Sequence, residues 1–337
     1  MTTQTNSLVD LSVLRGKSRW HWSEYLFWLL PIAAWFLFPN SLSLLSQIAI
    51  TALFALSLDL ILGYAGIVSL GHAAFFGVGA YAAGLLSARY GYGDPLLGLA
   101  VAALVSAAVG FVSSLLVLRG SDLTRLMVTI GVGMMLFEAA NKMTDITGGV
   151  DGLQGVEMKP LLGQWNFDLY GKTAYIYSVV VLFILFWIAR RLVNSPFGLS
   201  LRGIKLNSYR MPALGVSINT RLMAIYTIAA AYAGIAGALL TQTTQFATIE
   251  VLGFGRSADL MLMLILGGTG SLYGALLGAA VFMTVHHFLS DLNPTYWQFW
   301  LGAALIVIVL FARDGIMGGI HALGKVINRK AVKGGVQ

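Results

Sequence analysis

The stretch SPFGLSLRGIKLNSYRMPALGVSINTR, residues 195–221, is a basic segment between two long apolar runs. It contains no acidic residue, and two arginines lie shortly before it, at positions 190 and 191. Loops that stay on the cytoplasmic side of a membrane carry an excess of Lys and Arg. The segment is therefore predicted to be a cytoplasmic loop between two membrane spans. Its own basic residues are Arg202, Lys205, Arg210 and Arg221.

Residues 201–211 within this loop predict a short amphipathic helix, because apolar and basic positions separate onto two sides at about 100° per residue. We expect the apolar side to rest on the membrane bundle and the basic side to face a cytoplasmic partner. Pro212 should limit the helix, because proline disfavours helical geometry in the residue before it. The alternative is a loop whose charge only fixes topology. The apolar side holds Leu201, Ile204, Ser208 and Met211, and the basic side Arg202, Lys205, Tyr209 and Arg210.

The composition is that of a membrane protein. The chain has 337 residues, of which 58% are hydrophobic and 10% charged, whereas about 25% of the residues of a soluble domain are charged. There is no cysteine, which excludes disulfides, thiolate catalysis and zinc–thiolate sites. The net charge of +7 would suit nucleic acid, but the basic residues cluster in loops on one side of the spans. We expect the lipid bilayer, and no nucleic acid, as a partner.

Apolar runs of roughly 20 residues each predict an all-α polytopic membrane protein with about ten transmembrane helices, including broken or short ones. The eighth run is short and is either a span or a re-entrant helix, and the glycine-rich GGTGSLYG that follows it fits a broken helix. The transmembrane domain would cover residues 22–312, between a tail over 1–21 and a tail over 313–337. The expected spans are 22–39, 41–62, 67–88, 95–118, 122–141, 173–193, 221–243, 257–268, 271–290 and 295–312.

The distribution of charge predicts that both termini lie in the cytoplasm. Most of the 21 Lys and Arg residues fall in the segments expected inside, whereas most acidic residues fall in the segments expected outside. The first apolar run lacks a small-residue cleavage site, so we expect it to stay in the mature protein. The basic inner segments are 1–24, 119–125, 190–221 and 313–337.

Few residues suggest chemistry. Asp59, Glu138 and Asp259 lie near the ends of spans, whereas ion-coupled carriers usually keep such residues at the midplane. We therefore expect structural or interfacial roles, and no proton- or sodium-driven transport. His72 lies in the small-residue segment SLGHAAFFGVGAYAAG, where it could make a packing contact or line a cavity. Neither a metal-binding H-E-x-x-H motif nor a phosphate-binding loop occurs, so no metal, cofactor or ATPase site is predicted.

Several segments together resemble the permease subunits of bacterial hydrophobic amino-acid ABC importers, the LivM group. The resemblance covers about residues 40–320, and its motifs are specific in combination. They are GYAGIVSLGHAAFFGVGAYAAGLL (63–86), TGGVDGL (147–153), the basic loop followed by AYAGIAGALL, GGTGSLYGALLGA (267–279) and RDGI (313–316).

The resemblance implies an inner-membrane permease subunit of an ATP-driven importer of branched-chain or other hydrophobic amino acids. It also implies a second, homologous permease (LivH-like), two cytoplasmic ABC ATPases and a periplasmic substrate-binding protein. Candidate substrate-pathway residues are Ser69, Gly71, His72, Phe75, Gly77 and Gly79. The external loop motif comprises Thr147, Gly148, Gly149, Asp151 and Gly152. A helix coupling the permease to an ATPase would involve Arg202, Gly203, Ile204, Lys205, Tyr209, Arg210, Leu214 and Gly215.

The coupling loop departs from the family pattern. Leu206 and Ser208 occupy positions where the family usually has acidic residues. This departure favours an ATPase partner with a different groove. Methionines at 127, 134 and 135 are adaptable side chains that suit a non-standard cargo. Alternatives within the family are therefore importers of urea, short amides or aromatic compounds. From different classes, the alternatives are a self-contained ion-coupled carrier or channel and a membrane enzyme, for which no catalytic group is evident.

Overall fold

A computed structural model describes residues 22–120, 122–168 and 171–292, together with 294, 296, 299–300, 302–303, 306 and 315–319. In this part of the chain the regular structure is helical, apart from two isolated β-bridges. The α-helices are α2 (Trp22–Leu37), α3 (Leu42–Asp59), α4 (Ala73–Ala88), α5 (Pro95–Val117), α6 (Asp122–Lys142), α7 (Thr144–Thr147), α8 (Lys172–Val193), α9 (Pro196–Leu206), α10 (Ile218–Thr244), α11 (Phe254–Gly267) and α12 (Leu272–Leu292). Shorter turns are η1 (Pro39–Ser41), the π-helical η2 (Leu60–Tyr64), η3 (Gly149–Asp151), η4 (Pro212–Leu214) and η5 (Ile249–Leu252).

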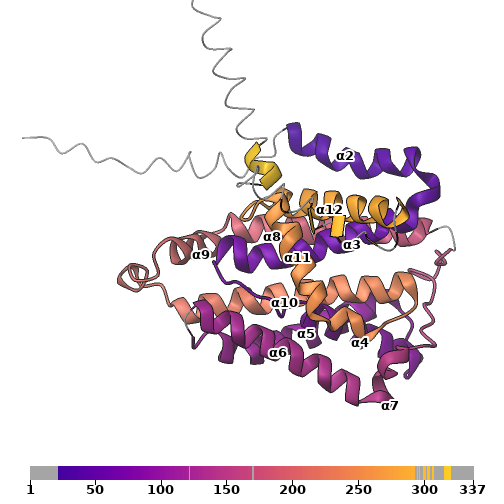
Figure 1. The fold of residues 1–337 in the computed structure, drawn as a ribbon, viewed down its shortest axis with the longest axis horizontal. Helices are drawn as coiled ribbons and strands as arrows, with labels where there is room; N and C mark the ends of the chain where they lie inside the picture. The colour runs from indigo at the N-terminus through magenta and orange to yellow at the C-terminus, as the bar shows by residue number, and fades with distance from the viewer. Residues whose placement is uncertain are drawn as a thin grey trace, which may run out of the picture.

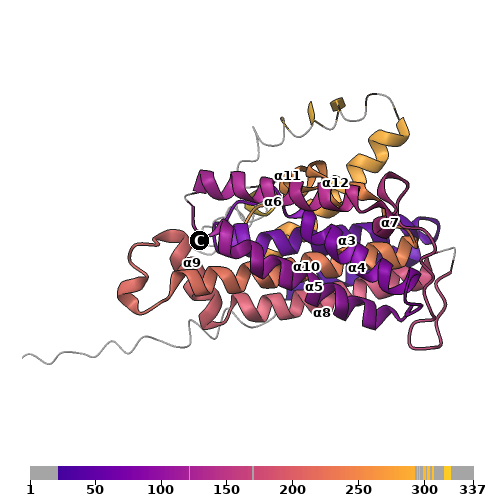
Figure 2. The same cartoon turned by 90° about the horizontal axis from the view of Figure 1, so that it is seen from below.

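Most of the long helices run along one axis of the molecule, and α9 and α7 lie at opposite ends of this bundle (Figures 1 and 2). We call the end with α9 the inner end and the end with α7 the outer end. Six helical segments among the described residues are long and apolar enough to cross a membrane. They are Pro39–Tyr64, Pro95–Val117, Leu123–Lys142, Lys172–Val193, Ile218–Thr244 and Leu272–Leu292.

The expectation of a helical, multi-pass membrane protein is confirmed, whereas the count of about ten spans and the orientation stay predictions. Helix α11 has 14 residues, which extend roughly 21 Å at 1.5 Å per residue. Since the hydrocarbon core is about 30 Å thick, α11 alone does not cross it, which favours the short or re-entrant alternative. The tail over 1–21, most of the expected tenth span (295–312) and most of the tail over 313–337 lie outside the described residues.

Helix α10 lies in the centre of the bundle because glycines let its backbone touch its neighbours. A Cβ added at Gly79 of α4 would lie 2.1 Å from the carbonyl oxygen of Gly234 in α10. One added at Gly237 of α10 would lie 1.8 Å from the carbonyl oxygen of Phe76. No side chain larger than hydrogen fits at such a contact, so α4 and α10 pack backbone to backbone.

Two helix breaks give the bundle its irregular core. Helix α3 ends in η2, and residues 65–72 are unwound before α4 begins, so the expected span over 67–88 is helical only from Ala73. The second break joins α11 to α12 through Gly268 and Gly270, whose φ angles of 99° and 80° favour glycine. Both breaks lie toward the inner end.

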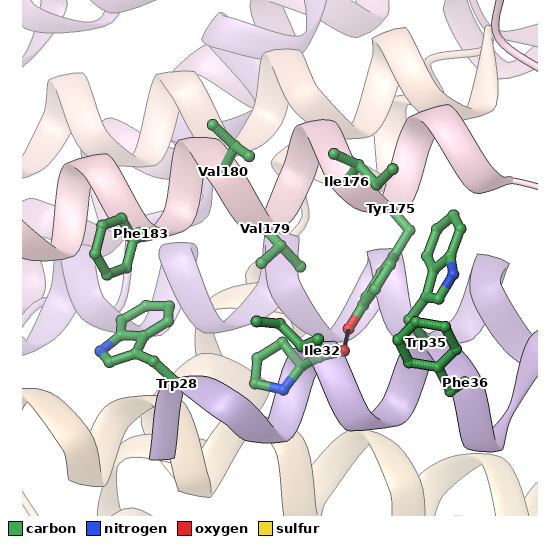
Figure 3. A pocket seen from close by; sticks show the side chains of 10 residues that line it. Trp28, Ile32, Trp35, Phe36, Tyr175, Ile176, Val179, Val180 and Phe183 are labelled. Atoms are coloured by element: carbon green, nitrogen blue, oxygen red, sulfur yellow. Dashed lines mark hydrogen bonds between the residues drawn. The ribbon is translucent and has the colours of Figure 1, made fainter. Parts of the chain in front are cut away.

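Helix α2 lies at the side of the bundle (Figure 1), and an apolar groove separates part of it from α8 (Figure 3). The groove has a volume of about 510 Å³, and the Tyr175 hydroxyl donates a hydrogen bond to the Pro31 carbonyl at 2.8 Å. Its lining contains no charged residue, which suits a surface that faces acyl chains. The lining residues are Trp28, Pro31, Ile32, Trp35, Phe36, Tyr175, Ile176, Val179, Val180 and Phe183.

The backbone contact at Gly237 generates a stability prediction. We expect Gly237→Ala to lower the free energy of unfolding by about 1–3 kcal/mol or more, because the new methyl group overpacks the α4–α10 contact. The measurement is the thermal unfolding midpoint in detergent. The matched control is Gly131→Ala in α6, where a Cβ would meet nothing within 4 Å. Equal midpoints for the two variants would contradict backbone-to-backbone packing of α4 on α10.

Candidate functional site

Helix α9 begins at Pro196 because Ser195 caps its N-terminus and Pro196 suits its first turn. Ser195 has extended backbone geometry and its hydroxyl accepts a hydrogen bond from the Gly198 N–H at 3.4 Å. Pro196 occupies the first helical turn, where its missing N–H costs nothing. The prediction of a helix over 201–211 is therefore wrong, since the helix starts and ends five residues earlier.

The helix ends at Leu206 because Asn207 is extended and its side chain organises a turn. The Asn207 carboxamide oxygen accepts hydrogen bonds from the N–H groups of Tyr209 and Arg210, at 3.1 and 3.2 Å. Asn side chains favour such turns over a continued helix. Tyr209 is 94% exposed and Leu214 is 74% exposed. Together with Arg210 they form the exposed tip of the loop, a name used below for residues 207–215.

The apolar side of α9 packs on the bundle much as expected. Leu201, Ile204 and Met211 are buried. A Cβ at Gly203 would lie 2.7 Å from the Met211 sulfur, so the loop folds back closely over this helix. Ser208, which was expected on the same side, is instead exposed, because the helix has already ended.

Two cations of α9 point to the chain itself, which corrects their expected orientation toward a partner. The Lys205 ammonium donates a hydrogen bond to the Gly63 carbonyl at 2.7 Å. The Arg202 guanidinium lies 5.1 Å from the centre of the Tyr64 ring. The physical reason is the break after η2, because carbonyls at a helix C-terminus lack intrahelical donors and accept bonds from other groups. Arg210 and Tyr209 remain in the exposed tip.

The buried carboxylate of Asp59 joins this inner end to the α11–α12 break. Its Oδ1 accepts a hydrogen bond from the Gly270 N–H at 2.7 Å. A Cβ at Gly63 would lie 2.1 Å from the same oxygen. Asp59 thereby lies where α9, the end of α3 and the α11–α12 break meet, and its structural role stays a prediction.

The candidate pathway residues Ser69, Gly71, His72, Phe75, Gly77 and Gly79 are all buried. The Ser57 hydroxyl donates to the Phe54 carbonyl, so it accepts from the His72 Nε2–H, 2.8 Å away. His72 also stacks on the Phe54 ring at 5.8 Å. A Cβ at Gly71 would lie 1.9 Å from the Thr129 carbonyl oxygen in α6. These contacts pack α3, α4 and α6 together, and the pathway role stays a prediction.

The external loop motif forms a compact turn at the outer end. The Thr147 hydroxyl donates to the Ala140 carbonyl at 2.6 Å and accepts from the Gly149 N–H at 3.2 Å. The φ angles of Gly148 and Gly152, 77° and 75°, favour glycine. The Leu153 N–H then donates to the Ala247 carbonyl at 2.8 Å. The motif therefore holds the segment that follows α10, while Asp151 stays exposed.

Sequence reasoning missed the residues that position the segment between α10 and α11. Gln245 ends α10 with a left-handed φ of 55°, which is uncommon outside glycine. A Cβ at Gly77 would lie 2.3 Å from Leu252 Cγ, so η5 packs directly on α4. No local pattern marks these contacts, because they join residues that are far apart in the sequence.

Residues 40–310 match the family described as "Branched-chain amino acid transport system / permease component". The high-affinity branched-chain amino acid transport system permease protein LivM of Salmonella typhimurium is 28% identical over 300 residues, covering 82% of this chain and 70% of that protein. The permease protein BraD of Pseudomonas aeruginosa is 25% identical, over 79% of this chain and 91% of that protein.

A more distant relative is named as a probable LivH permease protein. This protein of Methanocaldococcus jannaschii is 23% identical, over 72% of this chain and 80% of its own length. No solved structure matches the chain. Because the family match spans most of its length, the chain belongs to the family of branched-chain amino acid transport system permease components.

Proposed function

We propose that this chain is the membrane-spanning permease subunit of an ATP-driven importer of branched-chain or other hydrophobic amino acids. The observation that carries the proposal is the family match over residues 40–310. The relatives LivM and BraD bear names that assign them to high-affinity branched-chain amino acid transport. Long apolar helices support a multi-pass protein of the inner membrane.

The proposed topology has about ten spans with both termini in the cytoplasm. The transmembrane domain would be 22–312, flanked by tails over 1–21 and 313–337. Its support is the separation of the basic loop, at the inner end, from the external loop motif, at the outer end (Figures 1 and 2). A cytoplasmic inner end also follows the positive-inside rule.

The proposed partners are a second, LivH-like permease, two cytoplasmic ATPases and a periplasmic substrate-binding protein. Relatives named LivM and LivH both align with most of this chain, which supports a pair of homologous permeases. The sequence has no phosphate-binding loop, so ATP hydrolysis is assigned to the separate ATPase subunits.

The exposed tip of the α9 loop, with Tyr209, Arg210, Leu214 and Gly215, is proposed to dock on an ATPase. This tip is then attached to the bundle by Arg202, Gly203, Ile204 and Lys205. Movement of α9 would pull on the Gly63 carbonyl through Lys205, and thereby on Asp59 and Gly270. Such a contiguous chain of contacts can link two sites when each biases the same element.

The unwound segment before α4 is proposed to line the substrate pathway when the bundle opens. His72 lies in this segment, and its Nδ1 is buried without a hydrogen-bond partner among the described residues. A buried polar atom without a partner costs free energy, so a rearrangement that exposes it to water would recover that cost.

Transport by the assembled importer is the direct test. We expect the reconstituted complex of this permease with its partner permease, ATPases and cognate binding protein to take up leucine, isoleucine or valine at the expense of ATP. The permease chain alone should neither transport nor hydrolyse ATP. Preferential uptake of urea, short amides or aromatic compounds would show that the importer carries one of these and not a hydrophobic amino acid. Gradient-driven uptake by the single chain would refute an ATP-driven importer.

Topology is tested by reporter fusions. Fusions at Asn207 should report the cytoplasm and fusions at Glu157 the periplasm, because the basic loop and the external loop motif lie at opposite ends. The measurement pairs an alkaline phosphatase with a fluorescent protein reporter at each site. A periplasmic signal at Asn207 would invert the proposed orientation.

Two variants separate docking of the α9 loop from transmission through it. We expect Arg210→Glu to weaken ATPase binding about two- to tenfold, more at low salt, because exposed ion pairs are weak and screened over about 8 Å. Lys205→Met should leave ATPase binding intact but lower the uptake per ATP hydrolysed, because it removes the bond to the Gly63 carbonyl. The measurements are co-purification of the ATPases and the ratio of uptake to hydrolysis.

The matched control for these variants is Lys159→Glu, an exposed charge reversal at the outer end. It should change neither ATPase binding nor the ratio of uptake to hydrolysis. If Arg210→Glu and Lys205→Met behave like Lys159→Glu, the loop serves only as a topology signal.

A further inference from the structure

A small polar pocket opens near the outer end of the bundle, between α3, α10, η5, α11 and α12. Its volume is about 220 Å³, below the roughly 300–1,000 Å³ of pockets for drug-sized ligands. It therefore fits a smaller molecule. Its lining residues are Gln47, Thr51, Leu240, Thr244, Phe246, Thr248, Val251, Arg256 and Met283.

This lining differs in kind from the α2–α8 groove, which contains no charged residue. Gln47 and Thr51 on α3 converge with Thr248 and Arg256 from the α10–α11 side. Polar side chains that face the hydrocarbon region are costly, and such residues normally line a water-filled cavity or a protein contact. We therefore place the pocket on a water-accessible face of the permease.

Arg256 is the charged member of the lining. It is exposed, and no hydrogen bond or ion pair occupies its guanidinium within the described part of the chain. Asp259 follows one turn later on α11 and interacts electrostatically with Arg256 and with His286. A guanidinium presents a planar fork of donors that matches a carboxylate, and hydroxyl groups beside it supply further hydrogen bonds.

The remaining lining is apolar and comes from Leu240, Phe246, Val251 and Met283. A pocket with one cation, several hydroxyl and amide groups and an apolar wall is complementary to a small molecule with a carboxylate at one end and an aliphatic group at the other. Hydrophobic α-amino acids have this form.

We propose that this pocket binds the hydrophobic amino acid as it passes through the permease, with Arg256 as the ligand of its carboxylate. The inference rests on the proposed function and adds a site to it.

The walls of the pocket are attached to neighbouring elements. On the outer side, the hydrogen bond from the Leu153 N–H to the Ala247 carbonyl holds the chain between Phe246 and Thr248. The η5 wall is held from inside by the contact of Leu252 with Gly77. The pocket therefore changes shape when α4 or the external loop moves.

Cysteine protection tests the site, because the natural chain contains no cysteine. Thr248→Cys is placed in this chain, and the complete transporter in lipid nanodiscs is treated with a small cationic methanethiosulfonate reagent. Labelling of this chain is followed by mass spectrometry. We expect labelling, and we expect L-leucine to slow it. L-leucinamide, which lacks the carboxylate, should not protect.

Arg256→Gln in the same background should raise the leucine concentration for half-protection about tenfold or more, a change that corresponds to about 1.4 kcal/mol. The labelling rate without leucine should stay unchanged, which shows that the variant folds. Val150→Cys, in the external loop and 80% exposed, is the control that should be labelled without protection. Val180→Cys, in the apolar groove, should resist the charged reagent.

Several results would overturn the proposal. No labelling of Thr248→Cys would mean that lipid or a partner fills the pocket. Equal protection by leucine and leucinamide, or unchanged protection in Arg256→Gln, would remove the carboxylate site. If the binding protein without amino acid slows the labelling and leucine does not, the binding protein covers the pocket. Arg256 then contributes to docking of the binding protein and not to binding of a carboxylate. Leucine uptake by the unaltered complex is measured in parallel. Uptake of leucine without protection of Thr248→Cys refutes this site alone. Absence of any amino-acid uptake refutes the proposed function.

Discussion

The carboxylate of Asp59 is the contact on which the inner half of the bundle depends. A hydrocarbon environment offers no water to satisfy a buried acid, so its hydrogen bonds must come from the protein. Here one bond comes from the Gly270 N–H, which is free because the chain is non-helical between α11 and α12. The break after α3 likewise leaves the Gly63 carbonyl for Lys205. Two interrupted helices and one loop helix thus supply hydrogen bonds to one another.

The same logic explains why glycine governs the centre of the bundle. The hydrophobic effect does little to hold helices together in lipid, so they associate through close packing. Gly79 and Gly237 allow α4 and α10 to touch by their backbones, which leaves no space for gradual adjustment. A core packed in this way moves as a unit. Helix α9 and the segment between α10 and α11 add polar bonds to their apolar contacts with the bundle, through Lys205 and through the Leu153 N–H.

The sequence predicted the existence of most helices well, because long apolar runs depend little on tertiary contacts. It failed for α9, where the two-sided pattern of residues 201–211 was favoured over the start signal at Ser195 and Pro196. The orientation of Lys205 could not be predicted, because its acceptor exists only where η2 ends. The polar pocket was also beyond reach, since Gln47, Thr248 and Arg256 belong to distant segments that are unremarkable one by one.

The glycine-rich segment 63–86 connects the two ends of the molecule. At its start, the Gly63 carbonyl accepts the Lys205 bond, so the segment is attached to α9. Farther along, Gly77 touches Leu252, the neighbour of Val251 in the wall of the outer pocket. One continuous piece of chain thus contacts the α9 loop at the inner end and η5 at the outer pocket, and its backbone packs on α10 between them. For an importer with its energy source on one side and its cargo on the other, such a connection is the physical requirement, and the buried packing of this segment provides a continuous path for it.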